Sequence, residues 1–195
     1  MAQGTLTVIA GCMFSGKSEE LLRLLRRAAI ARQSTIVIKP AIDTRSEAQV
    51  CSRDGHCVTA VSVPHTGDII AAATPYDVIG IDEAQFFDDG IVAVVRDLYT
   101  RGKRVIVAGL DTDYRGESFG AMPHLMAIPE ADVLKLRAVC MQCSSEATRT
   151  FRKTTNSAQV DIGDADKYVA LCFSCYHAAG RVEAPMLAMA ATASR

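Results

Sequence analysis

The sequence predicts an α/β protein whose core is a mostly parallel sheet covered by helices on both faces. Short runs of β-branched residues alternate along the chain with segments of helical periodicity, the pattern of repeated strand–helix units. A glycine-rich segment follows the first strand, and two pairs of cysteines follow the last one. The cysteine pairs indicate that a small second module begins after the core.

The strands of the predicted core are short and rich in valine and isoleucine. They cover residues 5–10, 35–39, 77–81, 104–108 and 133–136. Nearly continuous apolar runs of this kind are typical of strands that are buried on both faces of a sheet.

Helices are expected at residues 18–32, 68–73 and 91–99, where apolar side chains recur at helical spacing. The apolar stripe of the first helix consists of Leu21, Leu22, Leu25, Ala28 and Ala29. The arginines beside it, Arg23, Arg26 and Arg27, could face a ligand, but such a row more often faces solvent.

The elements divide the 195 residues into two domains and a tail. We expect a core domain at 1–136 and a metal-binding module at 137–180. Residues 181–195 are rich in alanine and methionine without clear periodicity, so we expect a poorly ordered tail.

Composition excludes several classes of protein. The formal net charge of −1 argues against a sequence-independent nucleic-acid binder, which is usually basic. No run approaches 18 consecutive apolar residues, and the N-terminus does not resemble a secretory signal. We therefore expect a cytoplasmic protein with no membrane partner, in which paired cysteines bind metal rather than form disulfides.

Residues 11–18, GCMFSGKS, match the phosphate-binding pattern G-x-x-x-x-G-K-[ST] and lie between a predicted strand and a predicted helix. In this phosphate loop, backbone N–H groups and the positive end of the helix face the anion. Lys17 is expected to reach the β- and γ-phosphates, and Ser18 to coordinate Mg²⁺. The segment therefore predicts a site for a nucleoside triphosphate.

Two acids, Asp82 and Glu83, end the strand at 77–81. At this edge of a parallel sheet, Asp82 fits a Mg²⁺ partner and Glu83 could accept a proton from an attacking hydroxyl. The alternative is that both are ordinary surface acids.

Cys140, Cys143, Cys172 and Cys175 form two C-x-x-C pairs separated by 28 residues. Four thiolates suit a closed, structural zinc site that would hold together the base of the long loop at 144–171. The alternatives are free thiols, or His177 as a competing ligand.

Other candidate residues are less specific. Residues 43–45, DTR, could lie over the phosphates or form an exposed turn. His56, His65 and His124 show no ligand spacing and are expected to be structural or superficial.

Three function classes fit these motifs: a small kinase whose loop covers the acceptor, a nucleic-acid-dependent ATPase, and a nucleotide-binding regulator without catalysis. Charges of both signs cancel across the loop at 144–171, which disfavours the ATPase because a polyanion site would be basic. Glu83 argues against the regulator.

Several motifs together resemble the type II thymidine kinases, the cytosolic, zinc-containing family. They are GCMFSGKS, DTR, IDEAQFF at 81–87, GLD at 109–111, SFGAM at 118–122 and CMQC…ADKY…CFSCYH. The match runs from about residue 5 to 177. It implies transfer of phosphate from ATP to the 5′-hydroxyl of thymidine, and of deoxyuridine, on a RecA-like core with a zinc-held lasso.

The resemblance also implies roles for individual residues, with Glu83 as the catalytic base. The implied ATP site comprises Gly11, Cys12, Met13, Phe14, Ser15, Gly16, Lys17, Ser18, Asp82, Ala84 and Gln85. The implied thymidine site comprises Met13, Leu110, Tyr114, Phe119, Thr150, Tyr168 and a lasso segment at 159–163, formed by Gln159, Val160, Asp161, Ile162 and Gly163.

The same resemblance implies Mg²⁺ with ATP, structural Zn²⁺, a homotetramer, and feedback inhibition by dTTP. Cys12 departs from the family pattern, in which small residues such as proline or serine occupy this position. Because Lys17 is close in sequence and would favour a thiolate, we hypothesise that Cys12 can be oxidised.

Overall fold

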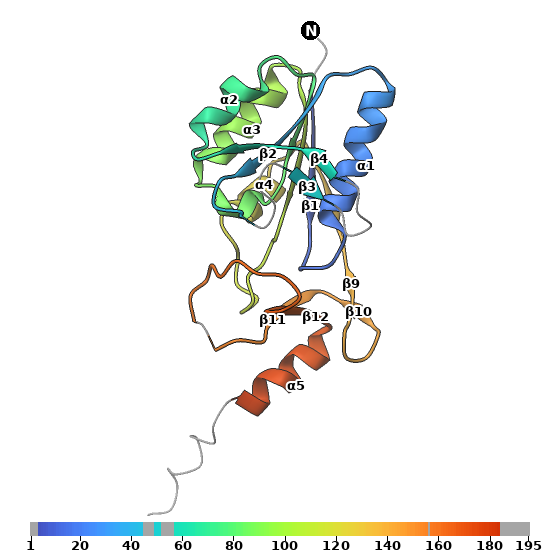
Figure 1. Cartoon of the computed structure of the whole chain (residues 1–195), viewed down its shortest axis with the longest axis vertical. Coiled ribbons are helices and arrows are strands. Elements are labelled where there is room, and N and C mark those ends of the chain that lie inside the picture. Colours follow the sequence, from blue (N-terminus) through green and yellow to red (C-terminus); the bar gives the residue numbers. More distant parts are fainter. Residues whose placement is uncertain (1–3, 45–48, 52–56, 156, 184–195) are drawn as a thin grey trace, which may run out of the picture.

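The computed structural model describes residues 4–44, 49–51, 57–155 and 157–183 (Figure 1). Its core is a six-stranded sheet with the order β5-β2-β6-β7-β1-β8, and every strand pairing in it is parallel. The strands are β1 (Thr5–Ala10), β2 (Thr35–Pro40), β5 (Val61–Val63), β6 (Val78–Ile81), β7 (Arg104–Gly109) and β8 (Ala131–Lys135). The predicted α/β class is confirmed.

Helices cover both faces of this sheet, as the sequence predicts. Figure 1 shows α1 on one side of the sheet, with α2 and α3 on the other. Alternation along each strand explains the two cores: in β1, Val8 packs toward α2, α3 and α4, whereas Ile9 packs toward α1. The helices are α1 (Lys17–Ile30), α2 (Gly67–Ala73), α3 (Gly90–Thr100) and α4 (Met122–Met126).

The arginines of α1 lie on its solvent-exposed face, as expected. Arg23, Arg26 and Arg27 are exposed, and Arg23 forms an ion pair with Glu20 one turn earlier. The buried side of the helix is the predicted leucine stripe, except that Ala29 is exposed.

Short elements of the core escape sequence analysis. The strands β3 (Gln49–Cys51) and β4 (Cys57–Thr59) form a separate antiparallel pair, and β5 has only three residues. The short helices η1 (Ala84–Phe86) and α4 were not predicted either. Segments of three to five residues are too short to display a period, so only their contacts define them.

The second module is richer in strands than its polar sequence suggests. It contains two antiparallel pairs followed by a helix, and Figure 1 shows it beyond the carboxyl ends of the core strands. Its elements are β9 (Ala138–Val139), β10 (Glu146–Ala147), β11 (Arg149–Arg152), β12 (Tyr168–Leu171) and α5 (Phe173–Glu183).

Helix α5 covers residues 181–183, the start of the expected tail, and residues 184–195 lie outside the described residues. Arg45 of the DTR segment and His56 lie outside them too, whereas Asp43 is buried and His65 and His124 are exposed. Among the described residues, no helix combines the length and apolar character needed to cross a bilayer.

Candidate active site

A cavity of about 270 Å³ lies where the carboxyl ends of the core strands meet the second module. Its lining includes Lys17 and Ser18 from the phosphate loop and Glu83 from the end of β6. All eleven residues expected around thymidine line it as well: Met13, Leu110, Tyr114, Phe119, Thr150, Gln159, Val160, Asp161, Ile162, Gly163 and Tyr168. Segments more than 100 residues apart in the chain thus share one cavity.

The phosphate loop connects β1 to α1 through left-handed backbone. Gly16 precedes α1 with φ +83°, a conformation that glycine adopts without steric cost. Lys17 is 9 % exposed and its Nζ donates a hydrogen bond to the Cys12 carbonyl oxygen at 2.8 Å. Burial lowers the pKa of Lys17, while Glu83 opposes that shift. Ser15 Oγ is buried and has no hydrogen-bond partner among the described residues.

Ser18 and Asp82 bring two oxygen donors together beside the loop. The Ser18 hydroxyl donates to Asp82 Oδ2 at 3.0 Å. Burial, and then the neighbouring Glu83 carboxylate, raises the pKa of Asp82 to about 7. A hydroxyl and a carboxylate are hard oxygen ligands, so this pair fits Mg²⁺ chemically.

Glu83 is held at both its backbone and its side chain. Its backbone has φ +52°, and its N–H donates to Asp82 Oδ1 at 3.0 Å. The side-chain amide of Gln85 donates to Glu83 Oε2 at 2.5 Å, and Gln85 Oε1 accepts from the Leu110 N–H at 2.9 Å. Gln85 therefore links the carboxylate of Glu83 to the segment that follows β7.

Several residues expected in the ATP site lie behind the cavity rather than on its wall. Asp82, Ala84 and Gln85 are buried and do not line it, and neither do Gly11, Cys12 and Ser15. Their contacts support the residues that do, as the Gln85–Glu83 pair illustrates.

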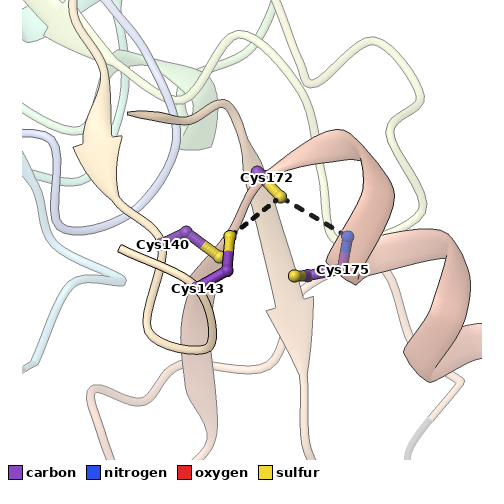
Figure 2. Close-up of side chains that lie close together, drawn as sticks. All are labelled: Cys140, Cys143, Cys172 and Cys175. Carbon is purple, nitrogen blue, oxygen red and sulfur yellow. Dashed lines mark hydrogen bonds between the residues drawn. The ribbon is translucent and has the colours of Figure 1, made fainter. Parts of the chain in front are cut away.

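The four cysteines converge on one point of the second module (Figure 2). Their Sγ atoms all lie within 4.8 Å of one another, and Cys143 Sγ lies 3.6 Å from Cys172 Sγ. Tetrahedral zinc with Zn–S bonds of about 2.3 Å requires S···S separations of about 3.8 Å. The cluster therefore fits a zinc ion, and among the described residues His177 is not part of it.

Cys12 corrects an expectation. Its side chain is 1 % exposed, and burial raises its pKa although Lys17 opposes that shift. The structure therefore contradicts the expected reactive thiolate, because burial limits access to the thiol and outweighs the charge of Lys17. Instead, Cys12 packs against Cys140, Ala147 and other residues of the second module, and its thiol lies 3.4 Å from the Ala147 carbonyl oxygen.

Arg152 and Asp113 are among the polar residues of the cavity wall that sequence analysis missed. Arg152 is 4 % exposed, although it was counted only as one of the charges of the loop. Asp113 Oδ2 accepts a hydrogen bond from Gln159 Nε2 at 3.1 Å, which connects the segment after β7 to the lasso segment. Arg152 belongs to β11, in which buried and half-buried residues alternate, but a strand of four residues is too short for its period to show in the sequence.

Comparison with known proteins agrees with this geometry. The family model of thymidine kinase matches residues 4–176. This chain belongs to the thymidine kinase family. Three similar proteins, each named thymidine kinase, come from Bacteroides thetaiotaomicron, Coprothermobacter proteolyticus and Rhodothermus sp.. They are 46 %, 48 % and 47 % identical over 89 %, 87 % and 89 % of this chain and 87 %, 88 % and 81 % of their own length.

Membership of this family confirms the family and enzyme class expected from the motifs. The match begins just before β1 and ends within α5, so it includes both the core and the cysteine cluster. The phosphate loop, Glu83 and the lasso segment all lie inside it.

Proposed function

We propose that this chain transfers the γ-phosphoryl group of Mg²⁺-ATP to the 5′-hydroxyl of thymidine. The observation that carries the proposal is the shared cavity, in which the phosphate loop, Glu83 and the eleven residues expected around thymidine line one space. Family membership supports the same activity. A donor site and an acceptor site that open into one cavity can bring the two substrates into reacting distance.

Glu83 is proposed as the general base that accepts the proton of the 5′-hydroxyl. Its tether to Gln85 holds the carboxylate toward the cavity in one orientation. Lys17, which lines the cavity, supplies positive charge to the transferred phosphoryl group. Phosphoryl transfer depends mainly on such positioning and charge neutralisation.

Ser18 and Asp82 are proposed to hold the magnesium ion that accompanies ATP, because they offer adjacent oxygen donors. When bound, the ion neutralises charge on the phosphates. It would also stabilise the ionised form of Asp82, which burial disfavours.

The lasso segment is proposed to recognise the base through its backbone. Cytosine presents a donor where thymine presents an acceptor at position 4, so deoxycytidine would leave buried polar groups unpaired. Each such group costs about 1–3 kcal/mol, which is enough for strong rejection. Deoxyuridine keeps the same polar edge and is proposed as a second acceptor. A closed lasso would also exclude water, which would otherwise hydrolyse ATP.

Three further properties are proposed from the family resemblance. They are feedback inhibition by dTTP, assembly as a homotetramer, and action in the cytoplasm without nucleic-acid or membrane partners. The shape of the cavity supports inhibition by dTTP. One cavity reaches from the lasso segment to the phosphate loop, so the nucleoside of dTTP could lie at the lasso segment and its triphosphate at the phosphate loop.

A steady-state assay with Mg²⁺-ATP tests the proposal. It compares thymidine, deoxycytidine, no nucleoside, and a short single-stranded DNA. We expect thymidine monophosphate from thymidine, with little product from deoxycytidine. ATP hydrolysis that rises only with DNA would reject the proposal and favour a nucleic-acid-dependent ATPase.

A further inference from the structure

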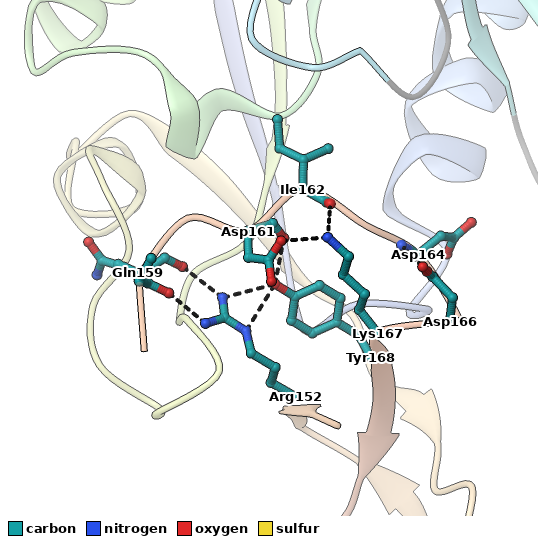
Figure 3. A network of polar contacts seen from close by, with 9 residues as sticks. Arg152, Gln159, Asp161, Ile162, Asp164, Asp166, Lys167 and Tyr168 are labelled. Carbon is teal, nitrogen blue, oxygen red and sulfur yellow. Dashed lines mark hydrogen bonds and ion pairs between the residues drawn. The ribbon is translucent and has the colours of Figure 1, made fainter. Parts of the chain in front are cut away.

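A buried arginine outside the recognised motifs organises the loop between β11 and β12. Arg152 is the last residue of β11, and its side chain extends into the turn of that loop (Figure 3). Its guanidinium carbon lies 3.7 Å from the centre of the Tyr114 ring and 5.4 Å from that of Tyr168. Aromatic faces stabilise a desolvated guanidinium group, which accounts for a cation at a position that is 4 % exposed.

The guanidinium donors are directed at the protein rather than into the cavity. Nη1 donates to the Ala158 carbonyl oxygen at 2.5 Å, and Nη2 donates to the Gln159 carbonyl oxygen at 3.2 Å. Nε and Nη2 both donate to the Tyr168 hydroxyl, at 3.2 and 2.9 Å. With these donors engaged, Arg152 is better suited to hold the loop than to bind a substrate phosphate.

The contact with Tyr168 fixes the direction of the next hydrogen bond. An arginine side chain can only donate, so the two contacts use the acceptor capacity of the Tyr168 oxygen. The Tyr168 proton must therefore be donated elsewhere, and the hydroxyl donates it to the Asp161 carbonyl oxygen, with the two oxygen atoms 2.6 Å apart. This relay runs from Arg152 through Tyr168 to Asp161, and its charged donor strengthens it.

Lys167 completes the support on the other side of the lasso segment. Its Nζ donates to the Ile162 carbonyl oxygen at 2.9 Å and pairs with Asp161 Oδ1 at 2.6 Å (Figure 3). The lasso segment is thus held through the carbonyl oxygens of Gln159, Asp161 and Ile162, and its residues line the cavity.

We propose that Arg152 is a positioning residue for base selection, which sets the shape of the lasso segment through its carbonyl contacts and the Tyr168 relay. This inference rests on the proposed function, because the lasso segment reads the base only if the acceptor is a nucleoside. A planar fork with several donors is required here. Lysine keeps the charge but cannot reach Ala158, Gln159 and Tyr168 together.

The test compares wild type, Arg152→Lys and Tyr168→Phe with the matched control Lys153→Met. Lys153 is the next residue and also donates to a loop carbonyl, that of Ala165, but outside the lasso segment. We expect Arg152→Lys to raise the KM for thymidine by on the order of 10- to 100-fold, with the KM for ATP nearly unchanged. The preference for thymidine over deoxycytidine should fall, and Tyr168→Phe should shift both values in the same direction by less.

Backbone amide hydrogen exchange gives a readout that does not need activity. We expect faster exchange across residues 159–163 in Arg152→Lys and unchanged exchange in β1 and β7. Unchanged thymidine KM and unchanged exchange would overturn the proposal. An equal loss of affinity for ATP and thymidine, with a lower melting temperature, would also overturn it and assign Arg152 to general stability. A wild type without thymidine-dependent turnover would reject the proposed function instead, since the exchange measurement would still report on the Arg152 contacts.

Discussion

Glu83 has a left-handed backbone conformation, which residues other than glycine rarely adopt. Its φ of +52° costs on the order of 1–3 kcal/mol, as does the φ of +69° at Phe14 in the phosphate loop. Asp82 and Gln85 offset this cost at Glu83 by hydrogen bonds to its N–H and its carboxylate. Both strained residues line the cavity, where such strain positions side chains for chemistry.

Replacing Glu83 tests the proposed base. Glu83→Gln keeps the size of the side chain and removes the carboxylate, so we expect kcat to fall by about 10²–10⁴-fold while ATP still binds. Turnover is measured beside the ATP dissociation constant. Glu130→Gln serves as the control, because Glu130 is exposed and does not line the cavity. Unchanged turnover in Glu83→Gln would remove Glu83 from this role.

The hydroxyl of Thr150 forms a hydrogen bond between the two modules, and replacing Thr150 tests how much that bond contributes to stability. The Met13 N–H of the phosphate loop donates to Thr150 Oγ1 at 3.0 Å, and Thr150 is 3 % exposed. Thr150→Val keeps the shape but leaves that N–H without its acceptor, so the free energy of unfolding should fall by about 1–3 kcal/mol. Denaturant titration measures it, and Thr150→Ser should retain most of the stability. Equal losses in both variants would contradict the hydrogen-bond explanation.

At the scale of elements, the packing of α1 on the sheet depends on a missing side chain. A Cβ at Gly80 in β6 would lie 2.9 Å from Leu25 Cδ1, closer than real Cβ contacts, and 3.2 Å from Leu21 Cδ1, which is tighter than most of them. The leucines of α1 therefore occupy the space that a side chain would need. This is a close helix–sheet approach of the kind that glycine permits.

Gly80→Ala is expected to lower the free energy of unfolding by about 1–3 kcal/mol, because the core must expand around the added methyl group. Gly67→Ala is a suitable control, since a Cβ at Gly67 meets nothing within 4 Å. Thermal and denaturant unfolding of both variants measure the difference. Stability of Gly80→Ala equal to that of Gly67→Ala would show that α1 moves without cost.

At the scale of the whole molecule, the second module packs against the phosphate loop as well as closing the cavity. Cys12 shares a small apolar core with Ala138, Cys140, Ala147 and Leu171. The same module carries the cysteine cluster at the base of the long loop at 144–171, which contains the lasso segment, since Cys172 directly follows β12. A metal ion there would fix the two ends of that loop relative to the core.

Removal of the metal should therefore disturb the acceptor site first. We expect Cys143→Ser, or treatment with a zinc chelator, to weaken thymidine binding more than ATP binding. Calorimetric titration of each ligand and metal analysis measure this. Met141→Ser is the matched control, because Met141 lies between the paired cysteines and is 71 % exposed. Full metal content with unchanged thymidine affinity in Cys143→Ser would contradict a zinc-held loop.

The motifs that sequence analysis identified share one property, which is that their chemistry joins residues close along the chain. The phosphate loop, the pair Asp82–Glu83 and each C-x-x-C pair are local patterns, and the structure brings them to the cavity or to the cysteine cluster. The Cys12 expectation failed for the complementary reason. Sequence proximity to Lys17 suggested a thiolate, whereas burial against the second module raises the pKa.

The sequence by itself determined the α/β class, the family, the phosphate loop and the four cysteines. These features could be recognised because strand and helix periods and short motifs involve residues that are close together along the chain. Only the tertiary structure decided how Arg152, Tyr168 and Asp161 form a relay, and how Gln159 meets Asp113 across 46 positions. Such contacts depend on where separate segments are brought by burial of the core. A hydrogen bond between distant residues leaves no periodic trace in a single sequence.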